Sequence, residues 1–462
     1  MFINNVDIKR IFKIALPLII QQFFLQLQIY VDRAMLGHVN SDFFSAIGNV
    51  LVPYFAVTAI ITAICTGTAI LIAQSIGAKD EAQCKNYAEC SFIGNSLLSL
   101  TALAFFFFCS GYMFKLIGVQ SPILEYSTSY IKIISFSFLA LGLSATSVSI
   151  LQGIGITKII MYAGIISNII NILFDWFLIF GNSGFPQMGI NGAALASIIA
   201  NFTTAAILIF YVFVSMKITF KLNIFDALRF RWNKYVNVLK IGVPSGLEFA
   251  LWNVGNIIVV SFLNRLDLVS VGVYTLVFSI STFPLFIYMG FANAALTLVG
   301  QKTGENQHKQ AINVGFMCLC FALIFCIFFS FLFIILPKEI LGIFTNDNDY
   351  INYAASFMII VSITMFPKAI NNVIGLGIRG MGDTKWMLYG QIIGTILVII
   401  LSYIFIFIVK MGLMGVFLTF LIDETLRGII NILRFLKGRE FFLLKPFNNV
   451  IAQRQNTALP KR

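Results

Sequence analysis

Long apolar stretches, separated by short polar or basic segments, recur along the chain from its first residues to about position 434. Each is close to the ~20 residues that an α-helix needs to cross a bilayer core of about 30 Å. The pattern therefore predicts an all-α polytopic membrane protein with about twelve transmembrane helices. We expect these helices near 9–36, 46–74, 88–114, 126–152, 158–180, 189–215, 236–263, 269–299, 310–336, 351–376, 386–409 and 412–434.

The second half of the chain repeats the first. Pro17 matches Pro244, and Gln74 matches Gln301, both at an offset of 227 positions. Each repeat holds six spans, so both enter the membrane in the same direction, which is the parallel arrangement found in secondary transporters. Further matches follow in the same order: Gly77 with Gly304, QGIGITK (152–158) with RGMGDTK (379–385) and, at an offset of 223, GINGA (189–193) with GLMGV (412–416).

The duplication predicts two six-helix lobes, over residues 1–216 and 236–438. Residues 217–235 would join them and are expected to form an amphipathic helix on the membrane surface. Residues 439–462 would form a tail, and no separate hydrophilic domain is visible.

Composition agrees with a membrane protein. Apolar residues make up 59% of the chain and charged residues 11%, against roughly 25% charged residues in soluble domains. The net charge of +12 is concentrated before the first span, in the central linker and after the last span. By the positive-inside rule, this predicts that both termini and the linker lie in the cytoplasm. We expect the protein in the inner cell membrane. Topology thus explains the basic charge without a nucleic-acid partner.

The residues of a catalytic or metal site are scarce. The seven cysteines lie mostly within apolar runs and form no CxxC pair, so we expect neither a metal site nor a disulfide framework. His38 and His308 are the two histidines, and both are predicted in or near loops. We therefore predict a protein that is not an enzyme and has no cofactor.

Two carboxylates interrupt the predicted spans of the first half. Asp32 follows the run IALPLIIQQFFLQLQIYV (14–31), and Asp175 lies within GIISNIINILFDWFLIF (164–180). A charge inside the bilayer costs several kcal/mol, so such residues are functional candidates. Counting ~1.5 Å per residue places both about 25–33 Å from the cytoplasmic surface, and Asn171 shares a helix face with Asp175. The cluster predicts a Na⁺ site or a carboxyl pair that holds a proton.

Structural roles remain as alternatives for these residues. Asp32 precedes Arg33, and the two can form an ion pair at the membrane interface. Asn171 can instead hold helices together, a common role of amides in membrane proteins.

The second half has polar residues of its own. Glu248 and Lys368 are both expected near mid-membrane, where they would form a buried ion pair, either structural or part of a polar site. Asp423 and Glu424 lie near the middle of the last span, and Arg427 follows at a spacing that allows neutralisation. We expect a structural or gating cluster there.

The first span also carries polar and aromatic side chains at the spacing of a cavity lining. Gln22, Gln26 and Tyr30, together with Met161 of the fifth span, are candidates for a substrate cavity, because Met and aromatic side chains adapt to varied shapes. The alternative for any one of them is contact with lipid or with the protein core.

Seven segments carry a recognisable pattern: ALPLIIQQ (15–22), VDRAMLGHV (31–39), AQSIGAKD (73–80), QGIGITK (152–158), GVPSG (242–246), GQKTGE (300–305) and IRGMGDTK (378–385). These segments resemble the motifs of the multidrug and toxic compound extrusion (MATE) family, and the resemblance covers nearly the whole chain. It implies two six-helix lobes arranged in a V, a rocker-type mechanism coupled to a cation, and export of organic cations or other amphiphiles.

The resemblance also implies site residues. The archaeal and DinF-like branch of the family has its cation site at the positions of Asp32, Asn171 and Asp175. That branch has a hydroxyl residue in the sixth helix, which matches Ser197 through GAALAS. Pro17 matches a first-helix proline whose kink is implicated in the response to the cation.

Departures from the family pattern restrict the prediction. Other branches have acidic residues where this chain has Trp252 and Lys368, which argues against a second cation site there.

Our main hypothesis is a monomeric antiporter that exchanges H⁺ or Na⁺ for a small organic cation or amphiphile. The alternative is a lipid-linked oligosaccharide flippase of the related superfamily, but such proteins hold pyrophosphate with several basic residues, and this chain offers only Lys368 and Arg427 at depth.

Overall fold

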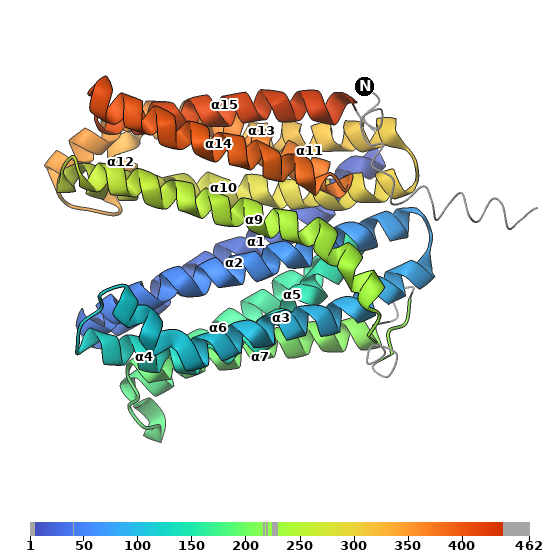
Figure 1. Cartoon of the computed structure of the whole chain (residues 1–462), viewed down its shortest axis with the longest axis horizontal. Coiled ribbons are helices and arrows are strands. Elements are labelled where there is room, and N and C mark those ends of the chain that lie inside the picture. The colour runs from blue at the N-terminus through green and yellow to red at the C-terminus, as the bar shows by residue number, and fades with distance from the viewer. Residues whose placement is uncertain (1–4, 40, 216–217, 219, 224–229, 438–462) are drawn as a thin grey trace, which may run out of the picture.

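The computed structural model describes residues 5–39, 41–215, 218, 220–223 and 230–437 (Figure 1). Within these residues, all regular secondary structure is helical. The predicted tail at 439–462 and residues 217, 219 and 224–229 of the predicted linker helix lie outside the described residues. The described linker residues 218, 220–223, 230 and 231 are not helical, and the first helix of the second half begins at Trp232, inside the predicted linker. The helices are α1 (Asn5–Val39), α2 (Ser41–Gly77), α3 (Glu81–Leu116), α4 (Ile123–Ile134), α5 (Ser137–Ile154), α6 (Lys158–Phe180), η1 (Asn182–Gly184), α7 (Ile190–Val214), α9 (Trp232–Asn264), α10 (Leu268–Gly304), α11 (His308–Ile335), α12 (Pro337–Gly342), α13 (Asn348–Gly380), α14 (Thr384–Tyr403), η2 (Ile404–Ile408) and α15 (Leu413–Lys437).

The long helices correspond to the predicted spans. Eleven helical segments within the described residues are long and apolar enough to cross a membrane. The twelfth predicted span is α15, which has 25 residues and carries the charged residues Asp423, Glu424 and Arg427 near its middle. The fourth predicted span, 126–152, is two helices, because α4 ends at Ile134 and α5 begins at Ser137.

The sequence repeat is also a repeat of backbone geometry. Lys79 and Asn306, 227 positions apart, both adopt left-handed backbone conformations after α2 and α10, with φ of 54° and 59°. Gly155 and Gly382 do the same after α5 and α13, with φ of 92° and 95°. A residue in this conformation commonly ends a helix, and glycine adopts it without steric cost. The repeated motifs therefore mark equivalent helix ends.

Two groups of helices lie side by side (Figure 1). We call α1–α7 the N-terminal lobe and α9–α15 the C-terminal lobe. The end of the molecule where α7 ends and α9 begins is called the linker end here, and the opposite end is the far end. The lobes meet at the linker end and diverge toward the far end, while α9 runs obliquely between them (Figure 1).

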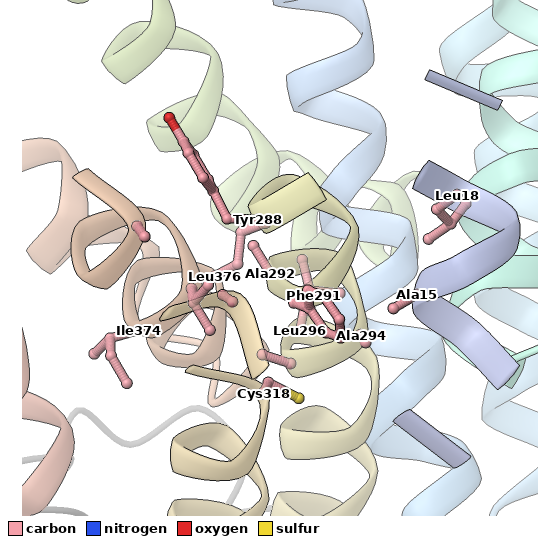
Figure 2. Close-up of a cluster of buried hydrophobic side chains, with 14 of the residues drawn as sticks. Ala15, Leu18, Tyr288, Phe291, Ala292, Ala294, Leu296, Cys318, Ile374 and Leu376 are labelled. Carbon is pink, nitrogen blue, oxygen red and sulfur yellow. The ribbon is translucent and has the colours of Figure 1, made fainter. Parts of the chain in front are cut away.

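Equivalent helix pairs join the lobes. On one side α9 packs against α2, and a Cβ built on Gly242 would lie only 2.2 Å from the carbonyl oxygen of Ile64. On the other side α1 packs against α10. The positions there that correspond to Gly242 and Ile64 are Ala15 on α1 and Phe291 on α10, and both lie in one buried cluster (Figure 2). Small residues at these crossings let the helix backbones approach closely, as is common between membrane helices.

Candidate functional site

Packing of α1 on α6 brings the two carboxylates of the N-terminal lobe together. These helices contact each other along their length, and a Cβ built on Gly164 would lie 3.1 Å from the Cγ atom of Gln21. Further toward the far end, the carboxyl groups of Asp32 and Asp175 are close enough for a direct side-chain interaction. The predicted pair is therefore present as a pair, and its role in transport remains a prediction.

One face of α6 carries the rest of the polar group. Gly164, Asn168, Asn171 and Asp175 follow one another at spacings of four, three and four residues, so they lie on one side of the helix. Asn171 and Asp175 are completely buried, and Asn168 is 3% exposed. The Asn168 side chain donates a hydrogen bond to the carbonyl oxygen of Gly164.

The oxygen atoms of this group are largely without hydrogen-bond partners among the described residues. Asp32 Oδ1, Asn168 Oδ1, Asn171 Oδ1 and both carboxylate oxygens of Asp175 are buried and unpaired, as is the Asn171 amide nitrogen. Buried polar atoms are normally paired, and an unpaired one destabilises the fold. Five such oxygens on two neighbouring helices suit a hard cation, which prefers oxygen ligands, or a proton between the carboxyl groups.

A buried tyrosine, which the sequence analysis did not select, extends the group. Tyr130 on α4 is 5% exposed and lies within electrostatic range of both Asp32 and Asp175. The hydroxyl group of Tyr54 lies 2.7 Å from that of Ser137, next to the break between α4 and α5. The sequence offered one signal for Tyr130. It lies near the outer limit predicted for the fourth span, so its expected depth in the membrane is similar to that of Asp32.

Ser197 and Pro17 lie apart from these contacts. Ser197 is half-buried on α7, which packs against α6, but no described hydrogen bond joins its hydroxyl group to the carboxylates. The hydroxyl group on α6 that does bond to α7 is that of Ser167, which donates to the carbonyl oxygen of Ala200 at 2.7 Å. Pro17 is buried inside α1, which is helical from Asn5 to Val39.

The candidate cavity residues of α1 lie on the helix face that turns toward α10. At the linker end, Ile19 and Ala15 on this face contact Gly290 of α10. Gln22, Gln26 and Tyr30 continue the same face at helical spacing, but Gln22 and Gln26 are half-exposed and Tyr30 is 38% exposed. The side chains gain exposure where the lobes diverge.

Met161 is half-buried on α6, seven residues before Asn168 and on the same helix face. It therefore lies on the linker-end side of the polar group.

The predicted Glu248–Lys368 ion pair is wrong. Glu248 instead pairs with Arg379, with a distance of 2.5 Å between the Glu248 Oε1 and Arg379 Nη2 atoms. Lys368 Nζ lies 5.9 Å from the centre of the Phe278 ring, and the nearby charges acting on it are those of Glu424 and Arg427. The prediction failed because counting residues gives depth only for helices that run straight across the membrane, whereas α9 is oblique (Figure 1).

The charged cluster of α15 is neutralised locally, as its spacing indicated. Arg427 forms hydrogen bonds with both carboxylate oxygens of Asp423 and lies 3.6 Å from Glu424. Its remaining amino group donates to Gln391 on α14. Glu424 also accepts a hydrogen bond from Asn371 on α13. Glu248 and Asp423 of the C-terminal lobe are therefore paired with arginines, whereas the structure shows no basic partner for Asp32 and Asp175 among the described ion pairs.

Comparisons with known proteins agree on one family. The sequence model described as MatE matches residues 17–177 and 244–404, two segments with the same offset as the repeat. A probable multidrug resistance protein NorM from Thermotoga maritima is 26% identical over 447 residues, covering 93% of this chain and 92% of that protein. The uncharacterized transporter YisQ from Bacillus subtilis is 26% identical over 428 residues, covering 91% and 92%.

The fold also matches a solved structure, described as the outward-facing conformation of a multidrug resistance MATE family transporter of the MOP superfamily. Its TM-score is 0.87 at 19% sequence identity, with 95% of this chain and 96% of that chain covered. The chain thus has the two-repeat, V-shaped fold of that transporter.

Proposed function

This chain belongs to the MatE family of multidrug efflux transporters, and on this basis we propose that it exports organic cations or other amphiphiles in exchange for H⁺ or Na⁺. As a member of that family it is a multi-pass membrane transporter and not an enzyme. The observation that carries the coupling proposal is the group of buried, unpaired oxygens around Asp32 and Asp175.

Coupling requires that the cation bind differently in the two states of the transporter. The carboxyl groups belong to different helices, α1 and α6, so a shift of α1 changes the distance between them. Two close carboxylates repel each other, and a proton or Na⁺ between them removes that repulsion. Occupation of this cluster would therefore favour one arrangement of α1, and substrate release would favour the other.

The substrate path would run along the exposed face of α1. Gln22, Gln26 and Tyr30 lie on that face where the lobes diverge, and they offer amide groups and an aromatic ring to a bound amphiphile. We place the linker end in the cytoplasm because basic residues are concentrated there. The V would then open away from the cytoplasm.

The alternative of an oligosaccharide flippase receives less support. Such a protein needs free basic groups in the central cavity to hold pyrophosphate. Arg379 and Arg427 are already engaged by carboxylates. Within the part of the chain that the structure describes, this leaves Lys368 as the basic group at depth without an ion pair.

Transport by purified protein in liposomes tests the proposal. Wild-type protein should accumulate ethidium against its gradient when a proton or a Na⁺ gradient is imposed, and imposing each separately identifies the coupling ion. Asp32→Asn and Asp175→Asn should each abolish accumulation, while Asp349→Asn, at an exposed position of α13, should not. Wild-type rates in the Asp175→Asn variant would exclude the coupling role.

A further inference from the structure

Two glutamines join the lobes at the linker end in the same way. The Gln74 side chain on α2 donates a hydrogen bond of 2.9 Å to the carbonyl oxygen of Gly380 on α13. The Gln301 side chain on α10 donates a bond of 2.9 Å to the carbonyl oxygen of Gly153 on α5. Donors and acceptors are each 227 positions apart, so the second bond is the repeat-related copy of the first.

The helix ends around these bonds touch through their backbones. A Cβ built on Gly77 would lie 1.9 Å from the carbonyl oxygen of Gln301, and one built on Gly304 would lie 2.0 Å from that of Gln74. The ends of α2 and α10 therefore cross at the pseudo-twofold axis. Gln74 is 8% exposed and Gln301 is 4% exposed, so both bonds are shielded while the lobes are in contact.

The acceptors suit a contact that opens and closes. Gly153 and Gly380 lie in the last turns of α5 and α13, where carbonyl groups lack partners within their own helix. Such a carbonyl can bond to a glutamine across the interface or to water when the interface opens. Breaking the bond therefore does not disrupt either helix.

One half of the arrangement has an additional contact. Arg10 on α1 donates a hydrogen bond of 2.8 Å to the side-chain oxygen of Gln301. The repeat-related position of Arg10 is Asn237, whose side chain interacts with Tyr87 instead. Both the oxygen and the nitrogen of the Gln301 amide group are therefore hydrogen-bonded. The helix that provides Arg10, α1, also carries Asp32 near its far end.

We propose that Gln74 and Gln301 form a symmetric two-part latch that closes the linker end, and that both bonds open whenever the lobes separate there. The latch rests on the proposed function as an exchanger with two states, since only a transporter that opens at this end needs to release it. It makes the two glutamines positioning residues of the transport cycle, distant from the cation cluster.

Hydrogen–deuterium exchange of the intact protein in nanodiscs tests the latch directly. Gln74→Leu and Gln301→Leu remove the donors, and each should raise exchange about fivefold at the linker-end segments of α2, α5, α10 and α13. The double variant should raise it about 25-fold at the same segments if the two losses are independent. Gln310→Leu, at an exposed position of α11 near the same end, is the control and should leave exchange unchanged.

Replacement by glutamate separates a latch from a structural contact. The carboxyl group introduced by Gln74→Glu can donate to the Gly380 carbonyl when protonated and repels it when ionised. Burial at this position would raise the pKa of the new carboxyl group above its usual value of about 4.3. Exchange in this variant should therefore rise from about pH 5 to pH 8 relative to the wild type, which carries the same neighbouring ionisable groups, Lys79, Asp80 and Glu305. In Gln301→Glu, the ionised carboxylate would pair with Arg10, so the rise with pH should be much smaller.

The outcomes separate the latch from the proposed function. Unchanged linker-end exchange in the double leucine variant, or equal pH responses of the two glutamate variants, would overturn the latch, even if transport is normal. Failure of wild-type protein to move any cationic probe would overturn the proposed function, while the exchange results would still report whether the glutamines hold the lobes together.

Discussion

Buried charges are treated differently in the two lobes. In the C-terminal lobe, Glu248 is paired with Arg379, and Asp423 with Arg427. In the N-terminal lobe, both oxygens of Asp175 lack a hydrogen-bond partner among the described residues. Paired charges keep their environment electrically neutral in every state, whereas unpaired carboxylates respond to a proton or cation. We therefore expect the proposed coupling site in the N-terminal lobe.

The Glu248–Arg379 pair should contribute to stability. Glu248→Gln and Arg379→Gln each leave a partly buried charge unpaired, and we expect each to destabilise the protein by about 2–3 kcal/mol. The double variant should be more stable than the sum of the two losses predicts, because both charges are gone. Lys368→Met should have a smaller effect than either single variant.

Thermal unfolding of the purified variants in one detergent measures these differences. Additive losses in the double variant would show that Glu248 and Arg379 do not stabilise each other.

The predicted spans overlap the observed helices, but their ends differ by several residues, as at 74 and 299 against Gly77 and Gly304. The repeated motifs locate helix ends better, because Gly155 and Gly382 follow α5 and α13 in the left-handed conformation that glycine adopts without steric cost. The break between α4 and α5 was missed, since neither Ser135 nor Phe136 interrupts an apolar pattern as Pro or Gly would. Hydrophobic periodicity gives the number of helices, but it does not give their tilt or their contacts.

The cap of α10 offers a pH-dependent test at a helix end outside the apolar core. Asp267 accepts hydrogen bonds from the backbone and the hydroxyl group of Ser270, and these bonds lower the pKa of the Asp267 carboxyl group. Stabilisation by a carboxylate with a lowered pKa is present at neutral pH and is lost as the pH falls through that pKa. Asp267→Ala should therefore destabilise the first turn of α10 by about 1 kcal/mol at neutral pH.

Hydrogen exchange near Ser270, followed from pH 7 downward and corrected for intrinsic rates, should show the wild type approaching the Asp267→Ala variant in acid. Asp267→Asn, which retains a cap acceptor, should stay closer to the wild type at neutral pH. A difference that does not change with pH would mean that the charge of Asp267 does not support the cap.

The crossing of α2 and α10 should be equally intolerant of a methyl group on either side. Gly77→Ala and Gly304→Ala would each place a Cβ against a carbonyl oxygen at about 2 Å, and we expect each to cost about 1–3 kcal/mol. One displacement relieves both clashes, so the double variant should lose less than the sum. Gly48→Ala is the matched control on α2, because a Cβ there meets nothing within 4 Å.

Across the whole molecule, one scaffold is used twice with different polar contents. The position equivalent to Asp32 is Val259, and that equivalent to Asp175 is Ser402, both completely buried. The sequence predicted this asymmetry together with the fold, because charges stand out in apolar spans and the repeat supplies their uncharged counterparts. It could not predict Tyr130 beside the carboxylates or Arg379 beside Glu248, because these contacts depend on how helices from distant parts of the chain are rotated and tilted.

Replacing the two carboxylates by their counterparts should stabilise the fold and abolish coupling. The double variant Asp32→Val, Asp175→Ser removes two neighbouring carboxyl groups for which the described ion pairs show no basic partner, and such charges are costly to the folded state. We expect a higher unfolding temperature than the wild type and no accumulation of substrate against a gradient, a trade of function for stability. Ser402→Asp makes the reverse change in the C-terminal lobe and should lower the unfolding temperature without adding a coupled cation, since the position equivalent to Asn171 is the apolar Val398. If the double variant were less stable than the wild type, the two aspartates would be part of the structural core, and coupling would have to reside elsewhere.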